Sequence, residues 1–130
     1  MTRHSLREEL FKLLFRVEFN DLTEMDTQFD LFKEEEKLEP ADAEEIKSRF
    51  DDIVAGIDII DADLNDHVTG WDTSRIGKVE LTILRLAIYE IKKDDKVPTA
   101  AAINEAVELA KKFGPDGAAS FINGVLSKFA

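Results

Sequence analysis

The chain has 130 residues, the length of one ordinary domain, and 44% of them are hydrophobic, which is enough to bury a core. Its 17 basic and 28 acidic residues give a formal net charge of −11. This charge is unevenly spread, because residues 24–66 hold 16 acids and 4 bases and everything outside them sums to +1. The flanking segments can therefore face an anion, and the acidic total weakens an RNA-binding hypothesis without excluding it.

Several classes of function are excluded by residues that the sequence lacks. There is no cysteine, and His4 and His67 are the two histidines, so a disulfide framework, a thiolate nucleophile and a histidine-rich metal site are ruled out. No stretch approaches the ~18 consecutive apolar residues of a membrane span, and charges interrupt the N-terminal apolar region where a signal peptide would lie. The glycines match no nucleotide-binding fingerprint, and no serine lies in a nucleophile elbow. We expect a cytoplasmic protein that is not an enzyme, with no catalytic residues, no metal, no cofactor and no membrane partner.

The first predicted helix runs from about Leu6 to Phe19 and carries two apolar lines. A core stripe at 3.6-residue spacing is formed by Leu6, Leu10, Leu13, Leu14 and Val17. Beside it, Phe11, Phe15 and Phe19 step by four. A helix wedged between two others would explain this width; alternatively, Phe15 and Phe19 border a surface for another protein, because exposed aromatic patches usually have partners.

Two further helices precede the middle of the chain. A short acidic helix is predicted to be capped by Thr23, and it ends in the charged residues 34–37. After Pro40, apolar residues recur every three or four positions and predict one long helix to about Val68. Aspartates are assigned to the solvent face of that helix: Asp51, Asp52, Asp58, Asp61 and Asp63.

The helix predicted over residues 73–92, with Asp72 or Thr73 as its cap, is apolar nearly all round and should be central. Arg85 within it needs a partner, and Glu105 or Glu90 is expected to neutralise it. The last two predicted helices run from Thr99, as a cap, to Phe113, and from about Ser120 to Phe129, with Gly114 stopping the first of them. No strand pattern is present, so the fold class is all-α, a compact bundle of packed helices.

Basic residues in three short stretches suggest an RNA surface. The stretches are Arg3, His4 and Arg7 at the start of the first helix; Lys92, Lys93 and Lys96 before Pro98; and Lys111 and Lys112 beside Phe113, with Phe121 after the next turn. Cations follow the backbone of single-stranded RNA while aromatic rings stack on unpaired bases. By their spacing, Phe113 and Phe121 are equally consistent with the core.

Four strings in the C-terminal half carry a resemblance to a known family. They are WDTSRI from Trp71, LRLAIYE from Leu84, INEAVELAK from Ile103 and FINGVL from Phe121. In this order they resemble the NusB family of bacterial transcription antitermination factors. The predicted helix from Leu6 to Glu18 has the same place in the chain as the first helix of that family, so the resemblance covers essentially the whole chain. It implies a single NusB-like domain over residues 1–130, with six to seven helices in two three-helix subassemblies.

The resemblance also implies a function without catalysis. Such proteins pair with NusE, a ribosomal small-subunit protein, and the pair binds the single-stranded boxA segment of nascent ribosomal RNA transcripts. Tethering this RNA to RNA polymerase helps the enzyme read through terminators. Family members differ in whether they form homodimers, and a dimer would cover the RNA-facing surface.

Site residues follow from the resemblance position by position. Arg3 and Arg7, with His4 between them, would contact phosphate, and further RNA contacts fall on Lys93, Lys96, Thr99, Lys112, Phe113 and Phe121. Phe15 occupies the position of a family tyrosine that faces NusE, with Phe19 one turn on and Glu80 completing that zone.

The sequence departs from the family where RNA is expected to bind. Family members often begin with a dense arginine run, whereas here Glu8 and Glu9 follow Arg7, and Ser120 stands where a lysine is common. We therefore expect weak RNA binding by the protein alone, strengthened by NusE. Two alternatives remain: a protein–protein or self-association module with weakened RNA binding, and a relative of the NusB-like domain of RNA methyltransferases, which is disfavoured because no methyltransferase domain follows Ala130. Gly124 is interpreted as allowing a close approach between helices.

Overall fold

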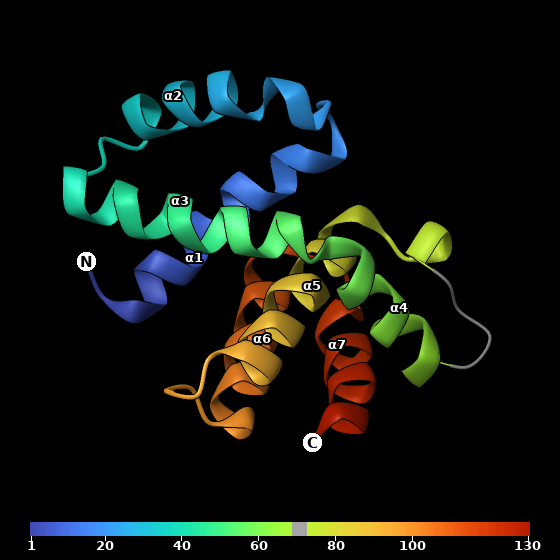
Figure 1. Ribbon diagram of the computed structural model, residues 1–130. Coiled ribbons are helices and arrows are strands. Elements are labelled where there is room, and N and C mark those ends of the chain that lie inside the picture. Colours follow the sequence, from blue (N-terminus) through green and yellow to red (C-terminus); the bar gives the residue numbers. More distant parts are fainter. Residues whose placement is uncertain (69–72) are drawn as a thin grey trace. The chain divides into compact units, whose positions relative to one another are not determined.

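The computed structural model describes residues 1–68 and 73–130, and within them the chain folds into seven α-helices and no strand (Figure 1). The α-helices are α1 (Arg3–Phe15), α2 (Met25–Glu35), α3 (Pro40–Ala55), α4 (Ile57–His67), α5 (Lys78–Lys93), α6 (Thr99–Phe113) and α7 (Ala118–Leu126). The described residues also form four short 3₁₀ helices, of which the first three lie between α-helices and the last follows α7: η1 (Arg16–Glu18), η2 (Leu22–Glu24), η3 (Thr73–Arg75) and η4 (Ser127–Phe129). The chain divides into two compact units, residues 1–54 and 55–130. The all-α class and the expected number of helices are confirmed.

The long helix predicted after Pro40 is interrupted at Gly56, where the structure differs from the prediction. α3 ends at Ala55 and α4 begins at Ile57, with Gly56 between them at φ −104° and ψ 12°. Glycine weakens a helix interior because it has no side chain to restrict the backbone. The apolar spacing continues across this short break, which is why the sequence pattern read as one helix.

The remaining differences from the sequence-based prediction lie at the ends of helices. Thr2 caps α1 by accepting a hydrogen bond from the Ser5 backbone N–H at 3.0 Å, and the chain tightens into η1 after Phe15. The predicted cap at Thr23 is wrong, because Thr23 lies inside η2 and Glu24 precedes α2. Thr99 is likewise the first residue of α6 and not its cap, since Pro98 holds the extended capping conformation.

The stop predicted at Gly114 is confirmed as the residue after α6. Thr73 lies inside η3 and therefore does not cap α5, which is preceded by Gly77. The predicted cap at Asp72 and the start of the WDTSRI string fall outside the described residues.

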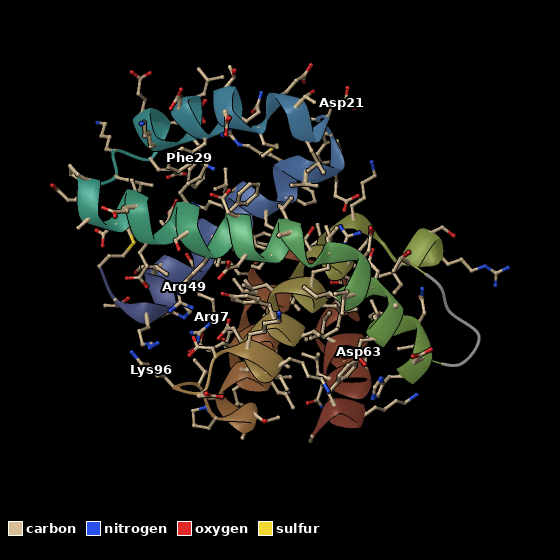
Figure 2. All side chains as sticks on the ribbon, in the orientation of Figure 1. Arg7, Asp21, Phe29, Arg49, Asp63 and Lys96 are labelled. Carbon is tan, nitrogen blue, oxygen red and sulfur yellow. The ribbon has the colours of Figure 1, made fainter. Side chains whose placement is uncertain are left out.

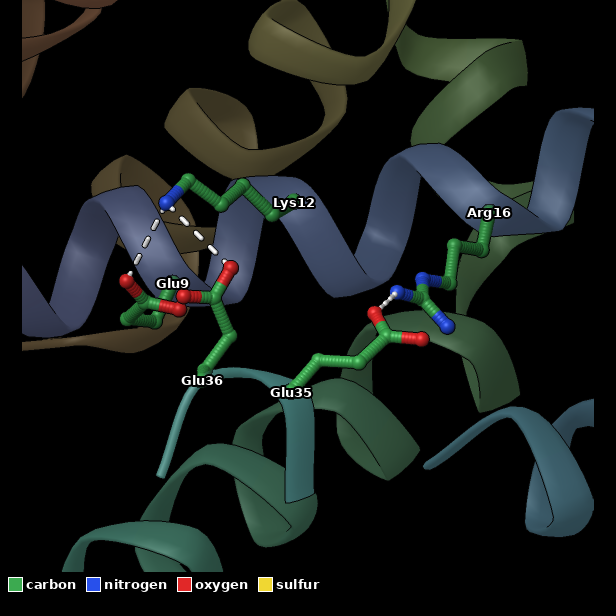
Figure 3. Close-up of polar contacts among 5 residues, drawn as sticks. All are labelled: Glu9, Lys12, Arg16, Glu35 and Glu36. Atoms are coloured by element: carbon green, nitrogen blue, oxygen red, sulfur yellow. Dashed lines mark hydrogen bonds and ion pairs between the residues drawn. The ribbon is translucent and has the colours of Figure 1, made fainter. Parts of the chain in front are cut away.

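In the first unit, α2 lies antiparallel to α1 and η1. Lys12 of α1 bonds Glu36 after α2 at 3.4 Å, whereas Arg16, one turn later, bonds Glu35 (Figure 3). Arg16 also bonds Gln28 of α2. Buried side chains on α1, α2 and α3 form the apolar interior of this unit: Leu10, Phe11, Leu13, Leu14, Met25, Phe32, Ala43, Ile46, Phe50 and Ile53.

The second unit is built around α5, which contacts α4, α6 and α7. Nine consecutive positions from Leu81 to Tyr89 are buried except Arg85, so the prediction of a central helix is confirmed for this unit. The Arg85 guanidinium donates two hydrogen bonds to Asp61 of α4, at 2.9 and 2.8 Å. Asp61 therefore does not face solvent as predicted, while Glu105 and Glu90 stay predictions as further partners.

No helix in the two described stretches combines the length and the apolar content that crossing a bilayer requires.

Candidate RNA and protein interfaces

Three phenylalanine rings form a line from the interior to the surface at the end of α1. The Phe11 ring is buried and stacks on Phe15 at a centroid distance of 5.9 Å; Phe15 is half-buried and meets Phe19 edge-on at 5.1 Å. Phe19 is 61% exposed. The four-residue spacing seen in the sequence thus places the rings in contact with one another, with the last two open to solvent. We call Phe15 and Phe19 the aromatic step.

Leu22, three residues after the aromatic step, is an exposed apolar residue that the apolar periodicity of the sequence could not identify as part of a surface. Leu22, the first residue of η2, is 54% exposed. It belongs to no apolar stripe, because the chain between α1 and α2 is built of short turns. Exposed apolar side chains close together in the chain are typical of protein interfaces.

Glu80, assigned with the aromatic step to a NusE zone, belongs to the other unit and lies in the first turn of α5. Its carboxylate folds back toward Gly77: a Cβ added to that glycine would lie 2.8 Å from one carboxylate oxygen. An acid in the first turn is stabilised by the positive end of the helix dipole.

The basic residues at the start of α1 are accompanied by acids. Arg3 and His4 are exposed and Arg7, labelled in Figure 2, is half-buried. His4 lies 3.3 Å from Glu8 on the next turn, so a protonated His4 has an acidic partner within its own helix. This stretch is a weaker anion-binding surface than its count of bases alone indicates.

Glu9, the residue after Glu8, is half-buried and has an incomplete set of partners. Lys12 contacts its Oε1 at 3.3 Å and also contacts Glu36, as Figure 3 shows. Its Oε2 is shielded from solvent and has no hydrogen-bond partner among the described residues. Burial therefore raises the pKa of the Glu9 carboxyl above its ordinary 4.5, against the opposing effect of Lys12. Burial alone would lower the pKa of Lys12, but its two acidic partners outweigh burial and raise it.

Replacing Glu9 with glutamine should change how stability depends on pH. Because the native state holds the Glu9 proton more tightly than the unfolded chain does, Glu9 lowers the free energy of unfolding progressively as pH rises above 4.5. Glu9→Gln lacks this penalty, so its stability relative to the wild type should increase from pH 4 to pH 7. Urea titrations across this range measure the difference, with Glu44→Gln at an exposed position of α3 as control. A difference that shrinks with pH would show that the Lys12 ion pair dominates.

In the second unit, the predicted RNA residues form two groups at opposite ends of α6. Before its start, Lys93 at the end of α5 and Lys96 in the following turn are exposed, and half-buried Thr99 is its first residue; Lys112 and Phe113 lie at its end. With a rise of 1.5 Å per residue, the 15 residues of α6 separate the two groups by about 20 Å. The structure thus does not bring all of these residues together at one point; they lie along the length of α6.

The group at the end of α6 combines cations with rings. The Lys112 ammonium lies 5.5 Å from the centroid of the Phe113 ring. Phe121 follows on the second turn of α7, and both phenylalanines are half-buried, neither sealed in the core nor fully exposed. This arrangement suits single-stranded RNA, for which rings offer stacking faces and lysines offer charge. We call Lys112, Phe113 and Phe121 the α6–α7 site.

Lys92, next to Lys93 in the sequence, is directed elsewhere. Its ammonium lies 3.8 Å from Asp63 and 5.8 Å from the Phe129 ring, which also stacks on His67 at 4.1 Å. Lys92 thus holds the C-terminal turn η4 against α4, a role that its position in a run of lysines could not reveal.

Gly124 of α7 was expected to permit close helix packing, and this is wrong. A Cβ added there would meet no atom of the described residues within 4 Å, and the residue is exposed. Its neighbour Asn123 is exposed as well. The Asn-Gly pair therefore faces outward, on the same short helix as Phe121.

A groove of about 680 Å³ between α2 and α3 was not foreseen. Phe29 lies in its lining, and the ammonium groups of Lys33 and Lys47 lie 5.3 and 5.7 Å from the centroid of that ring. A hydrogen bond to Asp51 at 2.7 Å raises the pKa of Lys47. Each lysine has an acid within 3.3 Å, Asp30 for Lys33, so the groove carries little net positive charge.

Comparisons with known proteins show the family to which the chain belongs. The sequence matches the NusB family over residues 4–130. It is 48% identical to the transcription antitermination protein NusB of Agathobacter rectalis, with both chains covered completely, and 48% identical to that of Lachnoclostridium phytofermentans, with 98% of each covered.

The fold is also similar to those of solved NusB structures. The fold is similar to that of T. maritima NusB, with a TM-score of 0.85 and 28% identity over 100% of this chain and 91% of that one. It is also similar to a chain in the crystal structure of antitermination factors NusB and NusE in complex with double-stranded RNA, with a TM-score of 0.80 and 27% identity over 98% and 96% of the two chains. Family match, full-length identity and fold agree, and the chain belongs to the NusB family.

Proposed function

We propose that this protein is a transcription antitermination factor that binds the boxA segment of nascent ribosomal RNA together with NusE and helps RNA polymerase read through terminators. It acts as one domain in the cytoplasm, as a binding adaptor that performs no chemistry. The observation that carries the proposal is the aromatic step, which ends in a phenylalanine that is 61% exposed. A large ring left in water at the end of a stack is typical of a surface that a protein partner covers, and a structural relative was crystallised with NusE.

In this proposal, NusE contacts the first unit through Phe15 and Phe19, and Glu80 of the second unit adds a charged contact. A half-buried ring and an exposed ring already in contact need little reordering on binding, which reduces the entropic cost of association. Aromatic residues, phenylalanine among them, are enriched in protein interfaces.

RNA binding is proposed along α6 of the second unit, with Arg3, His4 and Arg7 of the first unit as additional phosphate contacts. Lys93, Lys96 and Thr99 lie where α6 begins, and the free backbone N–H groups of a helix start favour phosphate. The α6–α7 site at the other end offers two rings for bases. A strand that reaches both groups would cover about 20 Å of α6.

Weak intrinsic RNA affinity follows from the charges. His4 has Glu8 as its neighbour, Lys92 faces Asp63, and Lys111 lies 3.4 Å from Glu108, so several bases are partly neutralised within the chain. Fewer phosphate contacts mean fewer counterions released on binding and a shallower dependence on salt. NusE would supply the missing contacts.

Affinity for boxA RNA measured with and without NusE across a salt series tests this function. We expect NusE to strengthen binding at every salt concentration, and the slope of log K against log salt to steepen by roughly 0.7 for each further phosphate of a single strand that the complex neutralises. Because the relative was crystallised with double-stranded RNA, a duplex of the same sequence is the second arm and an unrelated single strand the control. Equal affinities with and without NusE would contradict the adaptor mechanism.

The alternative, a self-associating module with weakened RNA binding, draws on different observations. The acidic block over residues 24–66 and the exposed side chains of Leu31 on α2 and Ile59 on α4 favour contacts with protein over RNA. Sedimentation velocity distinguishes the two functions: a homodimer that dissociates when RNA and NusE are added supports the adaptor, and one that excludes RNA supports the module.

A further inference from the structure

Arg16 lies between Phe15 and Phe19 in the sequence, and its side chain connects that part of the chain to α2. It is the first residue of η1, following Phe15 directly and preceding Phe19 by three positions. Its guanidinium donates hydrogen bonds to the side-chain oxygen of Gln28 at 3.0 Å and to that residue's carbonyl at 3.4 Å. The other terminal nitrogen lies 2.6 Å from Oε2 of Glu35 (Figure 3). One planar head group thus connects to two positions of α2 that are two turns apart.

The guanidinium also covers the interior of the first unit. It lies 5.3 Å from the centroid of Phe32, whose side chain is fully buried. The Arg16 side chain is only 24% exposed, which limits the directions that it can take. Stacking on the ring and a fork of hydrogen bonds together hold it in one orientation.

The backbone of the same residue fixes the position of Phe19. The Arg16 carbonyl accepts the Phe19 N–H at 3.1 Å, which closes η1, and it also accepts the Asn20 side-chain amide at 2.9 Å. Phe19 follows the last residue of η1 with φ −122° and ψ −3°, outside helical geometry. The backbone of Phe19, which carries the exposed ring, is therefore held by the Arg16 carbonyl.

We propose that Arg16 is a positioning residue for the partner surface: by binding α2 through its side chain and Phe19 through its carbonyl, it holds the aromatic step in the arrangement that a protein partner recognises. This inference rests on the proposed function, in which NusE is that partner. Glu35 is 58% exposed, so this ion pair adds little to stability and its main effect is on geometry. Preorganised side chains bind more tightly because less freedom is lost on association.

Lys12 provides a matched control within the same pair of helices. Lys12 lies on α1, one turn before Arg16 of η1, and its ammonium bonds Glu9 and Glu36, the latter at 3.4 Å and just after the end of α2. Substituting Lys12 with methionine removes a tie between α1 and α2 while leaving η1 in place. Any effect that arises only from loosening the two helices should appear equally in both substitutions.

The test compares Arg16→Met, Arg16→Lys, Lys12→Met and Phe19→Ala for NusE affinity, thermal stability and hydrogen exchange of the Phe19 amide. Methionine keeps the packing on Phe32 and removes the hydrogen bonds. We expect Arg16→Met to weaken NusE binding about tenfold, which corresponds to about 1.4 kcal/mol, and to speed exchange at Phe19. Lysine can reach one of the two partners on α2 and should restore part of the affinity, and Lys12→Met should leave both affinity and Phe19 exchange near the wild-type values.

Two results would overturn the inference. Equal losses of affinity in Arg16→Met and Lys12→Met would show that general loosening is responsible, and unchanged exchange of the Phe19 amide in Arg16→Met would show that Arg16 does not hold that residue. Phe19→Ala separates this inference from the proposed function. If Phe19→Ala leaves NusE affinity unchanged, the assignment of the aromatic step to NusE fails, whereas loss in Phe19→Ala without loss in Arg16→Met refutes the positioning role alone.

Discussion

Replacing Phe19 with alanine is expected to weaken NusE binding by roughly 30-fold or more, the effect of losing one central aromatic residue from a protein interface. The ring is 61% exposed, and it meets the Phe15 ring in a T-shaped contact at a centroid distance of 5.1 Å. Little of it is removed from water by folding, so the substitution should change the melting temperature only slightly. Isothermal titration of NusE into both proteins measures the loss, and thermal denaturation measures the stability.

Leu31→Ala is the control for this experiment. Leu31 is 45% exposed on α2 of the same unit, so its truncation removes a comparable area of exposed apolar surface. We expect it to leave NusE affinity within about twofold of the wild type, since most interface residues and all residues outside the interface contribute little. Equal losses for Leu31→Ala and Phe19→Ala would mean that the partner contacts α2 and not the aromatic step.

Removing the carboxylate of Asp61 is expected to have the largest effect on stability. Asp61 accepts two hydrogen bonds from Arg85, at 2.9 and 2.8 Å, and the two side chains are only 19% and 12% exposed. Asp61→Ala leaves a charge in the central helix without this partner; breaking a fully buried pair costs about 3–5 kcal/mol, and we expect about 2–3 kcal/mol here because some solvent reaches the pair. Urea denaturation followed by circular dichroism measures the change.

Asp58→Asn on the same helix controls for the loss of one acid from α4. Asp58 is exposed, and its substitution should change the free energy of unfolding by less than about 0.5 kcal/mol. Arg85→Met leaves the Asp61 carboxylate without this partner, and because Asp61 is the more exposed of the two side chains, at 19% against 12%, we expect a smaller loss than in Asp61→Ala. If Asp61→Ala unfolds at the wild-type urea concentration, the pair does not stabilise the second unit, and the predicted Glu105 and Glu90 become the partners to test.

The sequence-based prediction was most reliable where a single helix determines the outcome. The repeat of apolar residues identified the helices, their order and the central place of α5 in its unit, because burial of one face requires that spacing whatever the neighbours are. It also placed Phe11, Phe15 and Phe19 in one line, since positions four apart on a helix meet. The family resemblance rested on strings of residues and required no knowledge of packing.

Local breaks were harder to predict. The interruption at Gly56 keeps the apolar period in step on both sides, so that only the backbone reveals it. Thr23 and Thr99 satisfy the composition of a cap, but capping depends on backbone angles that neighbouring turns impose. Gly124 was given a packing role from its residue type alone, and the structure leaves open space beside it.

Partnerships between charges depended wholly on the tertiary structure. The sequence by itself determined that Arg85 needs an acid, but with 28 acids available it could not identify Asp61, which lies 24 positions away on another helix. In the same way Arg16 is one of many surface bases in the sequence, and only the packing of α2 against η1 gives it Gln28, Glu35 and Phe32 as partners. Helix periodicity is a local property of the chain, whereas the choice of a charge partner is made by which helix faces meet, and that is decided by packing.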